Sequence, residues 1–190
     1  LVPEERAARL FALLRPLHDS ARRMARCLCQ SWADGDDLFQ EAVLRALDRL
    51  DDLREEARFR PWFYAVLLSV HRARARRHFW RRFLPLPPHH GDAPRPADLG
   101  PDAEDVAGRA ARVAQALARL PAAQREALVL FECEGFTLEE VAAAQEASLS
   151  AVKTRLMRGR ARLREHYQGL LVAEEGALQP ALATRETRNG

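Results

Sequence analysis

The sequence predicts an all-α protein made of two small helical domains joined by a flexible, proline-rich linker. Apolar residues recur at steps of three and four along the chain, which is the spacing of one helix face. Six prolines gather in residues 84–103, which contain few large apolar residues, and this composition is typical of a linker. A length of 190 residues with 47% hydrophobic content suffices for packed cores. We therefore expect domains over 1–83 and 104–167, followed by a loose tail over 168–190.

The first domain is expected to begin with two apolar helical stripes. One lies on one or two helices between Pro3 and Trp32. Its members are Leu10, Leu14, Leu17, Ala21, Met24 and Leu28. Asp34-Gly35-Asp36 should break this pattern and supply the N-cap of the next helix. The second stripe consists of Leu38, Phe39, Ala42, Val43, Ala46, Leu47 and Leu50.

The first domain is expected to end in a basic helix. Segment 51–60 is polar and should form a loop, and Pro61 suits the first turn of the helix that follows. Trp62 and Phe63 lie on the apolar face of this helix and should be core residues. Three aromatic residues near its end stand among arginines, where they either stack on unpaired bases or cap the domain core. They are Phe79, Trp80 and Phe83.

The second domain contains the pattern of a helix-turn-helix. Thr137 and Glu140 have capping-box spacing, in which the Thr side chain accepts from the N3 amide and the Glu side chain reaches back. A short helix over 138–145, a turn over 146–148 and a further helix from residue 149, which Ser148 can cap, match the geometry of the motif. The second of these helices is the one that enters the major groove of DNA.

The outward residues at the start of this helix are the candidate DNA contacts. Val152 and Leu156 should point into the core, whereas basic and small polar neighbours can reach phosphates or base edges. The candidates are Ser150, Ala151, Lys153, Thr154, Arg155 and Arg158. The later arginines should contact the DNA backbone or water; they are Arg160, Arg162 and Arg164.

Charge is distributed unevenly along the chain. Residues 34–52 hold seven acids and two arginines, whereas residues 53–83 hold nine arginines and two glutamates. Residues 151–165 hold one lysine, five arginines and one glutamate. A single basic run is as often a solvated helix face, but two runs in two domains favour a two-point grip on a polyanion. The acidic segment is better suited to a protein partner.

The second domain resembles region 4 of the extracytoplasmic-function (ECF) sigma factors of bacterial RNA polymerase, and the first resembles region 2. In residues 112–165 the shared motifs are Leu120-Pro121, Arg125-Glu126, Gly135, Glu139-Glu140-Val141-Ala142 and Val152-Lys153-Thr154-Arg155-Leu156. In residues 37–77 they are DLFQEAVLRAL and FRPWFYAVLLSVHRARARR. The two halves occur in the family's order with a linker between them, which is more specific than either half alone.

The resemblance implies a sigma factor that binds core RNA polymerase, directs it to promoters and helps to open them. Region 2 would dock on the β′ clamp helices through Asp37, Leu38, Gln40, Glu41, Leu44 and Arg45. It would also engage the minus-ten element, while region 4 would read the minus-thirty-five element and contact the β flap. The resemblance further implies a cytoplasmic protein that is not an enzyme and that an anti-sigma factor holds inactive.

The sequence departs from the family pattern at two places. The helix-turn-helix turn often reads Leu-Gly-Val, but here it is Gln145-Glu146-Ala147, and glutamate does not adopt a positive φ as easily as glycine. On the melting helix, the usual Arg, Asn and Asp are replaced by Leu68, Ser69 and Ala73. We therefore keep only generic strand contacts for the minus-ten element, namely Arg72, Arg74, Arg76 and Arg77.

Other classes of function have little support in the sequence. Cys27-x-Cys29 with His18 or with His89-His90 lacks the spacing of a zinc site, so we expect no metal and no cofactor. No catalytic constellation, transmembrane run or signal peptide is recognisable, and three cysteines fit a reducing cytoplasm. The alternatives are a stand-alone helix-turn-helix regulator that binds a palindrome by itself, and an adaptor that occupies a protein without reading DNA.

Overall fold

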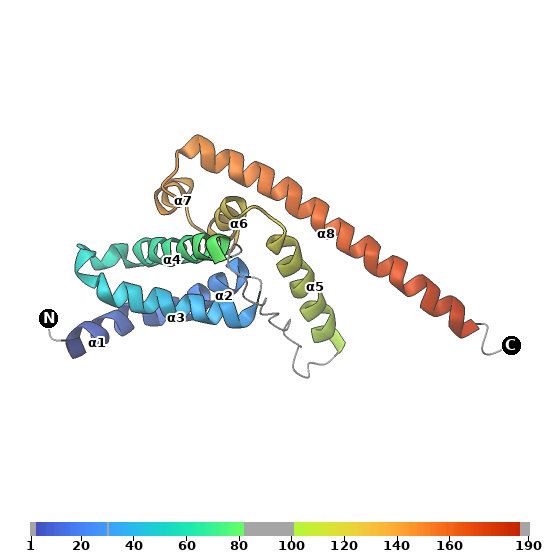
Figure 1. Cartoon of the computed structure of the whole chain (residues 1–190), viewed down its shortest axis with the longest axis horizontal. Helices are drawn as coiled ribbons and strands as arrows, with labels where there is room; N and C mark the ends of the chain where they lie inside the picture. The colour runs from blue at the N-terminus through green and yellow to red at the C-terminus, as the bar shows by residue number, and fades with distance from the viewer. Residues whose placement is uncertain (1–2, 30, 82–100, 187–190) are drawn as a thin grey trace.

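The computed structural model describes residues 3–29, 31–81 and 101–186, and within these ranges every regular element is a helix (Figure 1). The predicted all-α class is confirmed. The first four long helices form an N-terminal domain and the last four a C-terminal domain. The linker candidate lies mostly in 82–100, outside the described residues.

The N-terminal domain packs four helices around an apolar core. They are α1 (Pro3–Leu14), α2 (His18–Leu28), α3 (Trp32–Asp48) and α4 (Phe59–Arg81). Short 3-10 turns connect them at Arg15–Leu17, Leu50–Asp52 and Glu56–Arg58. Both predicted stripes supply the core, although Leu17, Val43 and Leu47 are only partly buried at its edge. Phe63 is fully buried as expected, and Trp62 packs against the core while partly exposed.

The start of α3 corrects one prediction. Asp34-Gly35-Asp36 does not interrupt the helix, because the N-cap is Ser31, whose hydroxyl accepts from the Asp34 amide at 3.0 Å. Gly35 is buried within α3 and faces α2. A Cβ at this position would lie 2.5 Å from the Arg26 Cα, so only glycine allows the two helices to approach this closely. Gly35 therefore allows α3 to pack closely on α2 and does not end a helix.

The loop expected over 51–60 is shorter than predicted. It contains two 3-10 turns, and α4 already begins at Phe59, so that Pro61 lies in its first turn. Proline is tolerated there because the first-turn amides have no partner within the helix. Phe59 is buried, which explains why the helix starts earlier than the polar composition suggested.

The C-terminal domain contains α5 (Pro101–Ala118), α6 (Ala122–Leu128), a π-helical turn η4 (Val129–Cys133), α7 (Leu138–Ala144) and α8 (Leu149–Glu186). Two boundaries differ from the predictions. Residues 101–103 belong to α5 rather than to the linker. Residues 168–186 continue α8 instead of forming a loose tail.

The helix-turn-helix has the predicted local geometry. Thr137 and Glu140 form both hydrogen bonds of the capping box, and the Ser148 hydroxyl accepts from the Ala151 amide at 3.2 Å. The turn contains a left-handed step, because Glu146 has a φ of 49°. A residue with a side chain thus occupies the backbone conformation that favours glycine. Gly135, the other residue with positive φ in the described ranges, has a φ of 65°.

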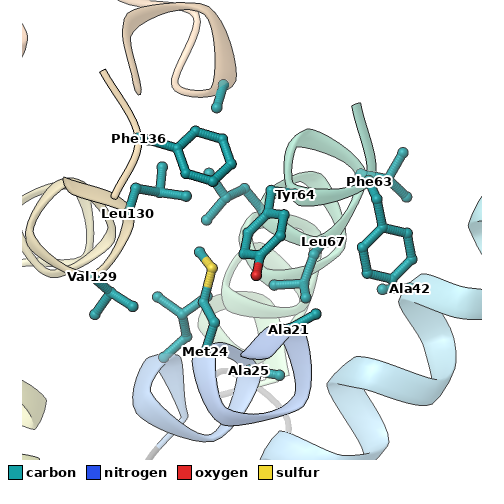
Figure 2. Close-up of a cluster of buried hydrophobic side chains, with 14 of the residues drawn as sticks. Ala21, Met24, Ala25, Ala42, Phe63, Tyr64, Leu67, Val129, Leu130 and Phe136 are labelled. Carbon is teal, nitrogen blue, oxygen red and sulfur yellow. The ribbon is translucent and has the colours of Figure 1, made fainter. Parts of the chain in front are cut away.

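The two domains pack directly on each other, which the sequence did not predict. Figure 2 shows Met24 of α2 and Tyr64 of α4 gathered in one cluster with Leu130 and Phe136 of the C-terminal domain. All four side chains are buried and belong to one continuous hydrophobic cluster that spans both domains. The two domains are therefore in direct contact, with α4 lying beneath α6 and α7 (Figure 1).

Candidate nucleic-acid and protein-docking surfaces

The first turns of α8 present the candidate base and phosphate contacts. Ser150, Lys153 and Arg158 are exposed, and Ala151 and Thr154 are partly exposed. The Thr154 hydroxyl donates to the Ser150 carbonyl at 2.9 Å, which uses its proton within the helix. Lys153 and Arg158 therefore offer the exposed cationic groups of this surface.

The opposite face of α8 anchors the helix. Val152 and Leu156 are buried as predicted. Arg155 is half-buried, and its Nη1 donates at 2.9 Å to the Oε1 of Gln145 in the turn. This bond turns part of the Arg155 guanidinium toward the turn rather than toward DNA. Gln145 is itself buried and was not singled out from the sequence, since the family usually has leucine there.

Two of the three later arginines of α8, Arg160 and Arg162, are engaged within the C-terminal domain. Arg160 pairs with Glu132 at 2.6 Å, and Arg162 donates to Gln124 at 3.3 Å. These contacts tie α8 to α6 and η4. They leave the beginning of α8 as the part best placed to enter a DNA groove.

The acidic helix α3 contributes to a groove with α1 and α2. The groove has a volume of about 720 Å³. Its lining residues are Phe11, Leu14, Arg15, His18, Asp19, Phe39, Gln40, Val43 and Leu44. Phe11 and Leu44 are 62% and 64% exposed, so the groove carries two large apolar side chains at its surface.

The six predicted polymerase contacts lie in different environments. Asp37, Gln40, Leu44 and Arg45 are exposed on α3. Leu38 is fully buried, so its side chain belongs to the core and does not reach the surface. The groove also adds residues that the sequence did not identify. Phe11 and His18 were missed because they lie off the apolar stripe of their helices, and only the fold shows that they face α3.

Glu41 connects the predicted docking helix with the predicted DNA-binding helix. Its carboxylate accepts from Arg74 at 2.6 Å and from Arg77 at 2.9 Å. Partial burial raises the pKa of Glu41, but these two hydrogen bonds outweigh it and leave the pKa below its ordinary value. Two of the four minus-ten candidates are thus ion-paired inside the N-terminal domain.

The remaining minus-ten candidates differ from these two. Arg72 pairs with Glu126 of the C-terminal domain at 2.9 Å, whereas Arg76 is exposed. At the positions where the family pattern is lost, Leu68 is fully buried and Ser69 is exposed. Leu68 therefore serves the core. The side chains of Phe79, Trp80 and Phe83 lie outside the described residues.

Asp36 fixes α3 against α2. Its two carboxylate oxygens accept from Arg22 and Arg26, each through two nitrogens, at 2.8–2.9 Å. These hydrogen bonds, first that of Arg22, hold the pKa of Asp36 far below its ordinary value. Arg26 also lies 4.5 Å from the Trp32 ring, a cation–π contact. Asp36 is a positioning residue for the groove rather than a cap.

Neither a metal site nor a membrane span is found within the described ranges. They hold no group of three or more His, Cys, Asp or Glu that could bind a metal ion. Burial raises the pKa of the Cys29 thiol to about 11, so without a metal this thiol is protonated at neutral pH. No helix in these ranges is sufficiently long and apolar to cross a bilayer. His89 and His90 lie outside the described residues.

Comparisons with known proteins agree with this arrangement. Residues 12–81 match the family sigma-70 region 2, and residues 110–163 match sigma-70, region 4. RNA polymerase sigma factor NccH of Alcaligenes xylosoxydans xylosoxydans is 33% identical over 133 residues, 69% of this chain and 72% of the relative. ECF RNA polymerase sigma factor SigM of Mycobacterium tuberculosis (strain H37Rv) is 30% identical over 151 residues, 80% and 73% of the two chains.

Two solved structures have a similar fold. CnrH in complex with the cytosolic domain of CnrY has a TM-score of 0.61 and 26% identity, covering 90% of this chain and 95% of that one. The sigma factor RpoE in complex with the anti-sigma factor NepR from Bartonella quintana has a TM-score of 0.61 and 23% identity, covering 82% and 94%. The likeness to RpoE concerns the fold alone.

Proposed function

This chain belongs to the extracytoplasmic-function sigma factors of the sigma-70 family, and we propose that it docks on core RNA polymerase through the groove between α1 and α3 while the start of α8 reads promoter DNA. As a sigma factor it binds core RNA polymerase, directs it to specific promoters and helps to open them. The observation that supports the assignment of surfaces is the presence, in one chain, of an exposed apolar groove and a cationic helix-turn-helix in separate domains.

The groove fits a protein helix better than it fits DNA. Binding energy at protein interfaces concentrates in a few large apolar anchors that fill a pocket, with polar groups at the rim. Phe11 and Leu44 supply such anchors, and Asp37 and Gln40 are exposed beside them. We therefore place the β′ clamp helices in this groove. The proposed docking residues are Asp37, Gln40, Glu41, Leu44 and Arg45, while the buried Leu38 supports this face from the core.

The start of α8 fits the major groove at the minus-thirty-five element. Its proposed contacts are Ser150, Ala151, Lys153, Thr154, Arg155 and Arg158. Lys153 and Arg158 carry the charge, and the buried Val152 fixes which side of the helix faces outward. At the minus-ten element the proposed contacts are Arg72, Arg74, Arg76 and Arg77, all on the basic part of α4.

The remaining parts of the proposal concern organisation and control. We assign residues 1–83 to polymerase docking and the minus-ten element, 84–100 to the linker, 101–167 to the minus-thirty-five element, and the rest to a C-terminal extension. The protein acts in the cytoplasm, where its polymerase is, without catalysing a reaction itself. An anti-sigma factor holds it, as in the complexes of CnrH with CnrY and of RpoE with NepR.

The proposed docking surface is tested by binding of the labelled chain to purified core RNA polymerase. Leu44→Glu places a charge at an apolar anchor, and we expect it to weaken binding roughly 10- to 100-fold. Val172→Glu is the matched control, since Val172 is 68% exposed but lies on α8. Asp37→Arg is preferable to a change at Glu41, because Glu41 also holds α4.

Three outcomes separate the hypotheses. Tight binding of the wild type and of Val172→Glu, with loss in Leu44→Glu, supports the groove. Equal binding of all three proteins would refute the groove while keeping the polymerase as the partner. If the wild type does not bind polymerase but shifts duplex DNA alone, the protein acts as a stand-alone regulator instead.

A further inference from the structure

The turn of the helix-turn-helix contains a buried amide side chain, that of Gln145. Gln145 is the C-cap residue of α7 and directly precedes Glu146. The family often has leucine at this position, which would fill the same space without any polar group. A buried amide is unfavourable unless its hydrogen bonds are made inside the protein, so its partners indicate what the glutamine contributes.

The partners of the Gln145 amide fix its orientation. Its Nε2 donates to the Ala123 carbonyl at 2.9 Å and to a carboxylate oxygen of Glu126 at 3.3 Å. Its Oε1 accepts from Arg155 Nη1 at 2.9 Å. A flipped amide would bring Oε1 against two acceptor oxygens, so Nε2 must face α6 and Oε1 must face Arg155. Because α6 and α8 carry all three partners, this arrangement lies entirely within the C-terminal domain.

Arg155 lies on one flank of α8. Steps of three and four residues place it with Ala151 and Arg158, beside the outward face of the helix. It is half-buried, and the bond to Gln145 is the one hydrogen bond that its guanidinium makes within the described residues. The flank of a helix in the major groove faces the sugar–phosphate wall, whereas its outward face meets the base edges. The position of Arg155 therefore favours a backbone phosphate over a base.

The bond through Nη1 leaves another edge of the Arg155 guanidinium available. Arginine has five N–H donors in a planar fork, and Nε and Nη2 together form an edge that matches two oxygens of one phosphate. Gln145 is neutral, so it accepts a hydrogen bond without compensating the charge of Arg155. Arg160, by contrast, pairs with the carboxylate of Glu132 at 2.6 Å. Arg155 is thus anchored while it keeps both its charge and a free donor edge.

We propose that Gln145 is a positioning residue for DNA binding, which holds Arg155 on the flank of α8 so that the Nε–Nη2 edge binds one backbone phosphate of the minus-thirty-five element. This inference rests on the function proposed above. An unrestrained arginine loses rotamer freedom when it binds, and this loss weakens affinity. Because Gln145 restricts the guanidinium before DNA arrives, part of the loss is avoided, which corresponds to roughly 2- to 10-fold in affinity.

Lys153 provides the matched control. It is exposed on the same helix, two residues before Arg155, but lies outside the hydrogen-bonded group of Gln145. A substitution at Gln145 should therefore act through Arg155 and leave the contribution of Lys153 to DNA binding unchanged.

The test measures the affinity of the holoenzyme, formed from the full chain and core polymerase, for a promoter fragment that the wild type selects from random DNA. The variants are Arg155→Ala, Gln145→Leu and the two together, with Gln145→Met as a second, unbranched replacement. A set of fragments carries a neutral methylphosphonate in place of one phosphate at a time across the minus-thirty-five element. Circular dichroism melting and binding to core polymerase check that each variant folds and docks.

We expect Arg155→Ala to weaken promoter binding about tenfold, and we expect one particular methylphosphonate to do the same. Gln145→Leu and Gln145→Met should weaken binding roughly 2- to 10-fold on the unmodified fragment. Neither should have a further effect in the Arg155→Ala background or on the fragment that lacks this phosphate charge, because the interaction is then already lost. In the Lys153→Ala background, Gln145→Leu should keep its full effect.

Three results would overturn the proposal. The first is unchanged promoter binding in Gln145→Leu and Gln145→Met. The second is a loss of equal size in the Arg155→Ala background, since Gln145 would then act on the fold and not through Arg155. The third is that every methylphosphonate weakens wild type and Arg155→Ala by the same factor. A wild-type chain that does not bind core polymerase, or a holoenzyme that selects no promoter, would contradict the proposed function and remove this inference with it.

Discussion

Glu146 offers a direct test of how the helix-turn-helix turn is stabilised. Its φ of 49° lies in the left-handed region, where a side chain costs roughly 1–2 kcal/mol relative to the right-handed region. Glu146→Gly removes this strain but increases the conformational freedom of the unfolded chain, a loss of about 0.5–1 kcal/mol. The net expectation is a gain in unfolding free energy of about 0.5–1 kcal/mol. For a chain of this length that corresponds to an increase in Tm of roughly 1–4 °C.

Two glycines provide matched controls for this substitution. Gly135 has a φ of 65°, and a Cβ added there would have no atom within 4 Å, so Gly135→Ala should lose about 1 kcal/mol through backbone strain alone. Gly169 lies within α8, where an added Cβ would also have no atom within 4 Å, and Gly169→Ala should gain about 0.5–1 kcal/mol of helix stability. If Gly135→Ala lowers the unfolding free energy and Gly169→Ala raises it, then the backbone φ, and not a side-chain contact, decides the effect of the added Cβ.

The measurement is urea or thermal unfolding of the full chain followed by circular dichroism. A lower midpoint for Glu146→Gly, together with no effect of Gly135→Ala, would refute the argument from backbone strain. In that case the Glu146 side chain would have to contribute through the unfolded state or through a contact made in solution.

Three further predictions concern packing, DNA binding and pH. Gly35→Ala should lower the unfolding free energy by about 1–3 kcal/mol in urea titrations, because the added Cβ would lie 2.5 Å from the Arg26 backbone. Gly108→Ala is the control and should be tolerated, because the Cβ added there would lie 3.7 Å from the flexible guanidinium of Arg112. Lys153→Ala should reduce the salt dependence of promoter binding by polymerase holoenzyme by about one unit of log–log slope if it contacts a phosphate, and an unchanged slope would argue against that contact. The ion pairs of Asp36 lower its pKa in the folded protein. The wild type should therefore be more stable than Asp36→Asn by a constant amount above about pH 4, and this difference in unfolding free energy should decline as the pH falls further. A difference that grows on acidification would contradict this pairing.

Local signals in the sequence predicted local structure well. The spacing of Thr137 and Glu140 identified the capping box, and helical periodicity identified Val152 and Leu156 as core residues. These succeed because capping and periodicity involve neighbours within one or two turns. Glu146 shows the limit of the same reasoning, since the fold holds this residue at a positive φ that its side chain disfavours.

Contacts between distant segments could not be predicted in the same way. Gly35 resembles a helix breaker until α2 is placed against it, and Leu68 resembles a lost DNA contact until its burial is known. Phe11 lies off its apolar stripe and becomes meaningful only beside Leu44 across the groove. The pairing of Arg72 with Glu126 joins residues 54 positions apart, and no periodic signal reports such a contact.

The bridge from Glu41 to Arg74 and Arg77 has a thermodynamic consequence. One carboxylate on the proposed docking helix pairs with two guanidinium groups on the proposed minus-ten helix. If a protein partner forms an ion pair with Glu41, Arg74 and Arg77 lose their carboxylate partner and become better ligands for phosphate. Conversely, when DNA phosphates bind Arg74 and Arg77, the Glu41 carboxylate is left available to the protein partner. Linkage requires that each event favours the other by the same factor, so this shared side chain couples the two binding equilibria without any change of shape.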